Sequence, residues 1–185
     1  DLEAPGMTEK KSPLVVWRTD EQIRARVREL GQRIQKDFNG AELYVMGILR
    51  SAFIFMADLV RAMDAPIHCQ FINMYYKDSA LKDNIVKEIE ETQLYPAHPL
   101  AGKNVLLVAT VLDTGIIMDH LLGHIREQGV QSVRIVTLID KPFMRRVDLK
   151  ADYAAFESQG AEFIFGYGLD YQEKYRNLPF LAKFR

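Results

Sequence analysis

The stretch from Asn104 to Gln128 constrains the fold of this chain more than any other part of the sequence. Val105 to Leu112 is a continuous apolar run of strand length, Asp113-Thr114-Gly115 predicts a tight turn, and apolar residues at helical spacing follow up to Gly129. A buried strand that turns at a glycine into a helix is typical of α/β folds with a mostly parallel sheet. Backbone N–H groups at the start of such a helix point at one place and favour a phosphate there.

Asp113 stands at the mouth of this predicted phosphate cradle. A carboxylate beside a phosphate is electrostatically unfavourable unless it serves a base, a hydroxyl group or a metal ion. The alternative interpretation is that Asp113 only caps the helix, a role that aspartate performs well. The spacing of the residues leaves both interpretations open.

Strand and helix patterns alternate through the rest of the chain. Thr19 followed by Gln22 predicts a capping box, and the apolar spacing after it predicts a helix that ends at Asn39-Gly40. A further helix is expected at 52–63, and strands are expected at 42–49, 67–75, 132–139, 153–156 and 163–165. Together these patterns predict one α/β domain with a mostly parallel sheet flanked by helices.

The segment 76–98 differs from its surroundings because it is polar and charged, with only scattered apolar positions. A segment of this length without a strong period is often a lid or a binding loop in a compact domain. A solvated excursion or a small hairpin is an equally good interpretation.

Composition argues against several classes of function. The 185 residues carry 24 Lys plus Arg against 25 Asp plus Glu, a formal net charge of −1, so no basic field would attract nucleic acid. No apolar run reaches the roughly 18–20 residues of a membrane span. The one cysteine, Cys69, suits a reducing cytoplasm, and the start lacks the blocks of a signal peptide. Met7 is expected to be the natural start, with residues 1–6 a cloning remnant.

Five segments carry a specific resemblance. They read LRSAFIFMADL (49–59), VLLVATVLDTG (105–115), DKPFMRR (140–146), FIFGYGLDY (163–171) and YRNLP (175–179). In this order they resemble the pyrophosphate loop, the phosphoribosyl pyrophosphate (PRPP) loop, the purine-recognition segment and the two-part C-terminal signature of hypoxanthine (guanine) phosphoribosyltransferases. The resemblance implies a type I phosphoribosyltransferase fold over residues 7–185, with a small hood and a flexible lid loop at about 76–98.

The resemblance also implies a reaction. N9 of hypoxanthine or guanine would attack C1 of the ribose of PRPP and expel pyrophosphate, with Mg²⁺ on the leaving group. An oxocarbenium-like transition state needs a neutralised leaving group and a place for the purine proton. The expected partners are the purine base and PRPP, without nucleic acid or membrane. Family members are usually homodimers or homotetramers, and a cytoplasmic location is expected.

Individual residues match roles in that family. Asp113 matches the acid/base residue beside the purine ring, and Asp170 matches a Mg²⁺ ligand, a hard donor for a hard cation. The phosphate cradle is expected to comprise Asp113, Thr114, Gly115, Ile116 and Ile117. The pyrophosphate contacts are expected to be Arg50, Ser51 and Arg176. The purine contacts are expected to be Lys141 at O6, the stacking ring of Phe163, and Ile164, Leu169 and Asp170. Taken singly, these residues could instead be surface charges, core residues or turn formers.

The departures from the family pattern fall in the same site. Ala109 and Thr110 stand where the family has two acidic residues that bind the ribose hydroxyls, Ile117 replaces a threonine, and Arg50-Ser51 replaces lysine-glycine. The serine-tyrosine pair of the lid is not clearly present. An alanine accepts no hydrogen bond, so one or two charge-assisted bonds of about 1.5–3 kcal/mol each are missing.

These departures leave two hypotheses. The first is a working purine phosphoribosyltransferase with a weakened PRPP site. The second is a catalytically impaired phosphoribosyltransferase-like protein that binds a purine nucleotide in a regulatory role. The retained Asp113 favours the first, whereas Ala109 and Thr110 favour the second. We therefore expect the protein to be a working phosphoribosyltransferase.

Overall fold

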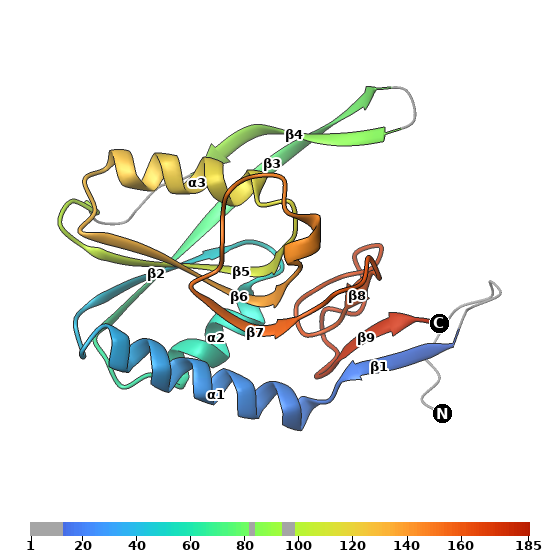
Figure 1. The fold of residues 1–185 in the computed structure, drawn as a ribbon, viewed down its shortest axis with the longest axis horizontal. Coiled ribbons are helices and arrows are strands. Elements are labelled where there is room, and N and C mark those ends of the chain that lie inside the picture. Colours follow the sequence, from blue (N-terminus) through green and yellow to red (C-terminus); the bar gives the residue numbers. More distant parts are fainter. Residues whose placement is uncertain (1–12, 82–83, 94–98) are drawn as a thin grey trace.

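Alternating strands and helices build a six-stranded sheet in the order β4-β3-β2-β5-β6-β7 (Figure 1). Its strands are β2 (Leu43–Ile48), β3 (Ile67–Leu81), β4 (Asn84–Gln93), β5 (Asn104–Leu112), β6 (Ser132–Asp140) and β7 (Tyr153–Glu157). All neighbouring pairs are parallel except β3 and β4. The structure, a computed structural model, describes residues 13–81, 84–93 and 99–185. The predicted α/β class with a mostly parallel sheet is confirmed.

Helices cover both faces of this sheet. The helices α1 (Asp20–Asp37) and α2 (Phe53–Arg61) pack on one face, and α3 (Ile116–Glu127) packs on the other (Figure 1). The predicted capping box is present, because the Thr19 hydroxyl accepts from the Gln22 N–H and the Gln22 side chain accepts from the Thr19 N–H. The helix α1 buries an apolar stripe of Ile23, Val27, Leu30 and Ile34.

The central strand β5 is buried on both faces. Leu106 and Val108 belong to the core beneath α1 and α2, whereas Val105 and Leu107 belong to the core beneath α3. Because successive strand residues point to opposite faces, such a strand shows a continuous apolar run instead of an alternation. The same holds toward the carboxyl end of β5, where Leu112 is buried in the core beneath α3 and Val111 packs against the other core.

A second, three-stranded antiparallel sheet lies beside the first. Its order is β1-β9-β8, with β1 (Leu14–Arg18), β8 (Ile164–Phe165) and β9 (Leu181–Phe184). This sheet and the turns at 166–180 form the hood. The sequence patterns predict β8 but miss β1 and β9. Ile164 and Leu181 extend the core beneath α1 and α2 into the hood.

The segment predicted to be a lid or a small hairpin is a hairpin in its described part. The strand β3 continues past the predicted end at Tyr75 to Leu81, and β4 pairs with it antiparallel. Figure 1 shows this hairpin projecting beyond the sheet. Two parts of the predicted lid, 82–83 and 94–98, lie outside the described residues. The predicted start at Met7 and the remnant before it lie outside them as well. In the described parts of the chain, no helix combines the length and the apolarity needed to cross a membrane.

Candidate active site

The carboxyl end of β5 and the start of α3 enclose a cavity of about 200 Å³. Parallel sheets bind their ligands at this end of the strands. Five of the predicted site residues line the cavity together: Ser51, Asp113, Gly115, Ile117 and Leu169. Ala109 and Thr110, the two departures at the predicted ribose site, line it as well. The fold therefore brings three distant segments of the sequence to one place.

The turn from β5 to α3 depends on a glycine. Gly115 is the N-cap of α3 with a φ of 79°, and a Cβ there would lie 2.8 Å from Cγ2 of Val147. Asp113 does not cap the helix, so that alternative interpretation is wrong. Instead its Oδ1 accepts a hydrogen bond of 2.6 Å from the N–H of Thr114. The Asp113 residue is exposed at the mouth of the cavity.

Arg145 ties the predicted purine-recognition segment to this turn. Its Nη1 donates to the carbonyl oxygen of Asp113 over 2.6 Å, and its Nη2 forms an ion pair with Asp140. The side chains of Arg145 and Asp140 are only 11% and 15% exposed. The N–H of Arg146 donates to the carbonyl oxygen of Thr114. These bonds hold the backbone of the predicted phosphate cradle against the loop after β6.

Of the residues predicted to contact the purine, Lys141 and Phe163 keep groups that a ligand could contact, whereas the side chain of Ile164 does not. Lys141 is buried, and its Nζ donates over 2.7 Å to the carbonyl oxygen of Glu162, the residue before Phe163. An ammonium carries three N–H donors, so Lys141 keeps donors beyond this bond. The Phe163 side chain is 58% exposed and meets Tyr171 edge to face at 5.8 Å, which leaves room for a ring to stack on it. The side chain of Ile164, by contrast, is buried in the core beneath α1 and α2.

The two predicted pyrophosphate arginines meet at a carboxylate that sequence reasoning missed. Arg50 Nη2 lies 2.9 Å from Oε1 of Glu173, and Arg176 Nη2 lies 3.5 Å from the same oxygen. Arg176 also pairs with Oδ1 of Asp170 at 2.8 Å and donates to the carbonyl oxygen of Gly168 at 2.9 Å. Glu173 belongs to a polar turn, and nothing in its local sequence distinguishes it from any solvated acid.

Residues 49–52, the loop that begins the predicted pyrophosphate segment 49–59, are held from two sides. The Ser51 hydroxyl forms a hydrogen bond of 2.5 Å with the Thr110 hydroxyl at the end of β5. On the hood side, a Cβ at Gly168 would lie 2.3 Å from the carbonyl oxygen of Ser51, so the close approach needs glycine. The loop therefore links β5 to the hood, and it carries Arg50 at an exposed position.

Asp170 is the residue expected to hold magnesium. Its Oδ1 pairs with Arg176, its Oδ2 accepts from the N–H of Glu173 at 3.0 Å, and its side chain is 31% exposed. Ionised carboxylates offer about four lone pairs, and Mg²⁺ is usually held by one or two carboxylates together with substrate phosphates. The donor set therefore fits an ion that binds with a pyrophosphate group. In the described residues, no group of three or more His, Cys, Asp or Glu could hold a metal by itself.

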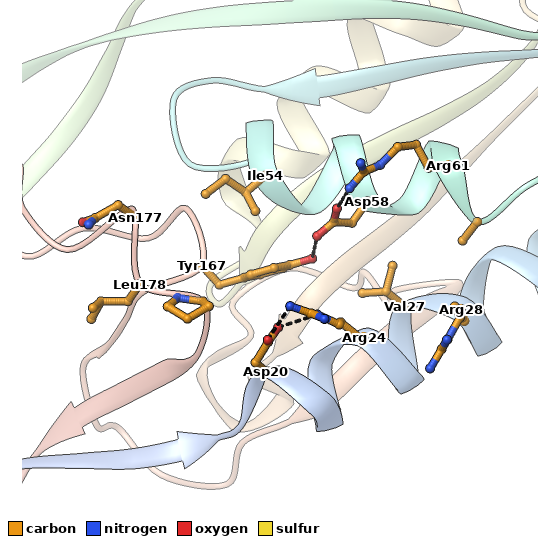
Figure 2. Close-up of a pocket in the computed structure, with 12 residues that line it drawn as sticks. Asp20, Arg24, Val27, Arg28, Ile54, Asp58, Arg61, Tyr167, Asn177 and Leu178 are labelled. Atoms are coloured by element: carbon orange, nitrogen blue, oxygen red, sulfur yellow. Dashed lines mark hydrogen bonds and ion pairs between the residues drawn. The ribbon is translucent and has the colours of Figure 1, made fainter. Parts of the chain in front are cut away.

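A larger cavity of about 670 Å³ lies between α1, α2 and residues 177–179 of the hood (Figure 2). The Tyr167 hydroxyl donates to Oδ2 of Asp58 over 2.5 Å, and Asp58 also pairs with Arg61. Burial, and then the hydrogen bond to Asp58, raise the pKa of Tyr167 far above its usual value. None of the predicted site residues lines this cavity. Through its bond to Tyr167, Asp58 ties the hood to α2.

Comparison with known proteins covers most of the chain. A model of the phosphoribosyl transferase domain matches residues 19–172. The hypoxanthine-guanine phosphoribosyltransferase of Bacillus subtilis (strain 168) is 34% identical over 165 residues, which are 89% of each chain. The enzyme of the same name from Streptococcus pneumoniae (strain R6) is 36% identical over 164 residues, 88% of each chain.

Solved structures agree with this result. A hypoxanthine-guanine phosphoribosyltransferase from Bacillus anthracis superposes with a TM-score of 0.79 at 35% identity, covering 92% of this chain and 97% of that one. A hypoxanthine phosphoribosyltransferase from Staphylococcus aureus gives a TM-score of 0.81 at 32% identity, covering 92% of this chain and 91% of that one. The similarity therefore extends over nearly the whole fold.

Proposed function

Because the chain belongs to the phosphoribosyl transferase domain family, we propose that it is a purine salvage enzyme. It transfers the 5-phosphoribosyl group from PRPP to N9 of hypoxanthine or guanine and releases pyrophosphate. The observation that carries this function is the cavity at the end of β5, where Asp113 and Gly115 meet Ser51 and Leu169. The relatives that match over most of both chains bear the name of this activity.

The phosphate cradle comprises residues 113–117. The backbone around Gly115 presents N–H groups at the positive end of α3, which favours the 5′-phosphate of the ribose. Arg145 keeps this turn in place by donating to the carbonyl oxygen of Asp113. Ile117, which stands at the place of the family's threonine, contributes only its backbone and an apolar side chain to the cavity.

The purine lies between the hood and the loop after β6 in this proposal. Phe163 offers an exposed ring for stacking, and Leu169 lines the cavity. Lys141 donates to the purine O6, and its existing bond to the carbonyl oxygen of Glu162 orients the ammonium. Asp113 accepts the proton that the purine ring loses, because its exposed carboxylate stands at the cavity mouth.

The leaving pyrophosphate carries the largest charge in the reaction. Arg50 and Arg176 supply cations from the pyrophosphate loop and from the hood, and Ser51 adds a hydroxyl group and a backbone N–H. Asp170 would hold a magnesium ion together with the pyrophosphate oxygens, and that ion would neutralise charge on the leaving group.

The regulatory alternative draws its support from Ala109 and Thr110. These residues remove charged contacts to ribose, but the predicted purine contacts and Asp113 are retained. The comparisons offer no support for a regulatory role. The departures therefore weaken the affinity for PRPP without changing the class of reaction.

Three further features stay predictions from the resemblance. We propose that residues 7–185 act as one phosphoribosyltransferase-like domain, with the hairpin of β3 and β4 as its lid. We also propose a homodimer or homotetramer and a cytoplasmic location.

A direct assay tests the proposed function. The purified protein is incubated with PRPP, Mg²⁺ and hypoxanthine, guanine or adenine, and the nucleotide products are separated and quantified. We expect inosine or guanosine monophosphate to form together with an equal amount of pyrophosphate, and little adenosine monophosphate. Failure to form any nucleotide at millimolar PRPP, while a purine monophosphate still binds, would instead support the regulatory alternative.

A further inference from the structure

Glu173 lies between the two arginines that the proposed function assigns to pyrophosphate. Its Oε1 is 2.9 Å from Arg50 Nη2 and 3.5 Å from Arg176 Nη2. Arg50 comes from the loop after β2, whereas Arg176 comes from the hood, more than a hundred residues later in the chain. One carboxylate thus joins two cationic groups that belong to different parts of the fold.

A two-residue turn with an unfavourable backbone conformation places Glu173 between the two arginines. Tyr171 and Lys174 exchange both backbone hydrogen bonds, each of 3.1 Å, so Gln172 and Glu173 form a two-residue turn. Their φ values are 53° and 61°, a region that glycine and asparagine favour and that long side chains rarely adopt. The Glu173 N–H donates to Oδ2 of Asp170, which fixes the turn beside the predicted magnesium ligand. Strained residues of this kind are found preferentially at functional sites.

The two arginines depend on Glu173 to different degrees. Arg176 is only 19% exposed and keeps bonds to Asp170 and to the carbonyl oxygen of Gly168. Arg50 is 72% exposed, and within the described residues Glu173 is its one polar partner. Removal of the Glu173 carboxylate would therefore release Arg50 while leaving Arg176 in place.

We infer that Glu173 is an internal competitor of pyrophosphate: its carboxylate occupies the anion site between Arg50 and Arg176 until the substrate displaces it. This inference rests on the proposed function, because it takes both arginines as pyrophosphate ligands. Glu173 is 63% exposed, and exposed ion pairs are weak, so a polyanion can replace it. After the reaction, the return of the carboxylate to the two arginines assists the departure of pyrophosphate. Glu173 is thus a positioning residue that sets how tightly the leaving group is held.

The test is the affinity of the free protein for inorganic pyrophosphate, measured by titration calorimetry with Mg²⁺ present. In Glu173→Gln, which keeps the size of the side chain but removes its charge, we expect pyrophosphate to bind about two- to tenfold more tightly at low salt. The same variant should have a lower KM for PRPP and stronger product inhibition by pyrophosphate. The gain in affinity should fade toward 1 M salt, where the Debye length is about 3 Å. A misfolded variant would bind less tightly, so a gain cannot come from damage to the fold.

A matched variant controls for net charge. Glu127→Gln removes one exposed acid at the end of α3, about 17 Å along that helix from the cradle, and should leave pyrophosphate affinity unchanged. Suppose that the wild-type protein forms nucleotide, but Glu173→Gln binds pyrophosphate no more tightly than the wild type does. That result would overturn the role of Glu173 and leave the proposed function standing. A wild-type protein that forms no nucleotide and binds no pyrophosphate would overturn the proposed function together with this inference.

Discussion

The hydroxyl groups of Ser51 and Thr110 lie 2.5 Å apart and connect the predicted pyrophosphate loop to the end of β5. The related enzymes are expected to carry an acidic side chain at the place of Thr110. Here a hydroxyl group stands there and makes its hydrogen bond within the protein, while Ala109 next to it offers no acceptor at all. The predicted ribose site therefore carries less negative charge than the family pattern, whereas the sequence retains Asp113, Lys141 and Phe163.

Placing acidic residues at positions 109 and 110, as in the family pattern, should increase the affinity for PRPP. The double variant Ala109→Glu with Thr110→Asp supplies one or two charge-assisted hydrogen bonds to the ribose hydroxyls, so we expect PRPP to bind about tenfold to several hundredfold more tightly. Equilibrium binding of PRPP measures the change. Thr110→Val, which removes the bond to Ser51 without adding charge, should not tighten binding. An unchanged PRPP affinity in the double variant would show that this site does not hold ribose as the relatives do.

Gln70 should limit the stability of the sheet. The amide nitrogen and oxygen of this β3 side chain are both buried, and neither has a hydrogen-bond partner in the described structure. Because unsatisfied buried polar groups are costly, Gln70→Met should raise the free energy of unfolding by about 1–3 kcal/mol. Urea denaturation measures this, with the exposed Gln131→Met as a control expected to change little. A clear loss of stability in Gln70→Met would contradict the prediction.

The bond between Tyr167 and Asp58 should stabilise the hood in a pH-dependent way. Removing the hydroxyl in Tyr167→Phe takes away a hydrogen bond to a carboxylate, so we expect a loss of about 1.5–3 kcal/mol at pH 7. Since folding raises the pKa of Tyr167, its contribution is complete below about pH 10, where unfolded tyrosine ionises, and declines as the pH rises further. Urea unfolding of both proteins from pH 7 to 11 should show the difference shrinking. If the free energies of unfolding of the two proteins instead differed by the same amount at every pH, the ionisation of Tyr167 would not be the cause.

The regular parts of the fold were predictable because each depends on local signals. The capping box at Thr19, the continuous apolar run of β5 and the glycine at the start of α3 each determine an element through nearby residues. The strands β1 and β9 were missed because they are short and are stabilised by pairing between the two ends of the chain. The hairpin of β3 and β4 was ambiguous because its strands carry many charged residues and lack a clear period.

The site was predictable in its residue types but not in its internal contacts. Asp113 and Gly115 were predicted at the phosphate cradle and Leu169 at the purine, and all three line one cavity. Glu173 gave no signal, since its contact with Arg50 depends on a turn far along the chain. The bond between Ser51 and Thr110 was likewise hidden, because a hydroxyl group at the place of an acid suggests only a loss.

The most direct test of the account compares wild-type protein with Asp113→Asn. Nucleotide formation from PRPP and hypoxanthine is measured for both, together with the affinity of each for inosine monophosphate. Because Asp113 is proposed to take the purine proton and only its exposed side chain changes, turnover should fall by about 10²- to 10⁴-fold while monophosphate affinity changes only a few-fold. Equal losses of turnover and affinity, or undiminished turnover in Asp113→Asn, would contradict the assignment of this cavity as the centre of phosphoribosyl transfer.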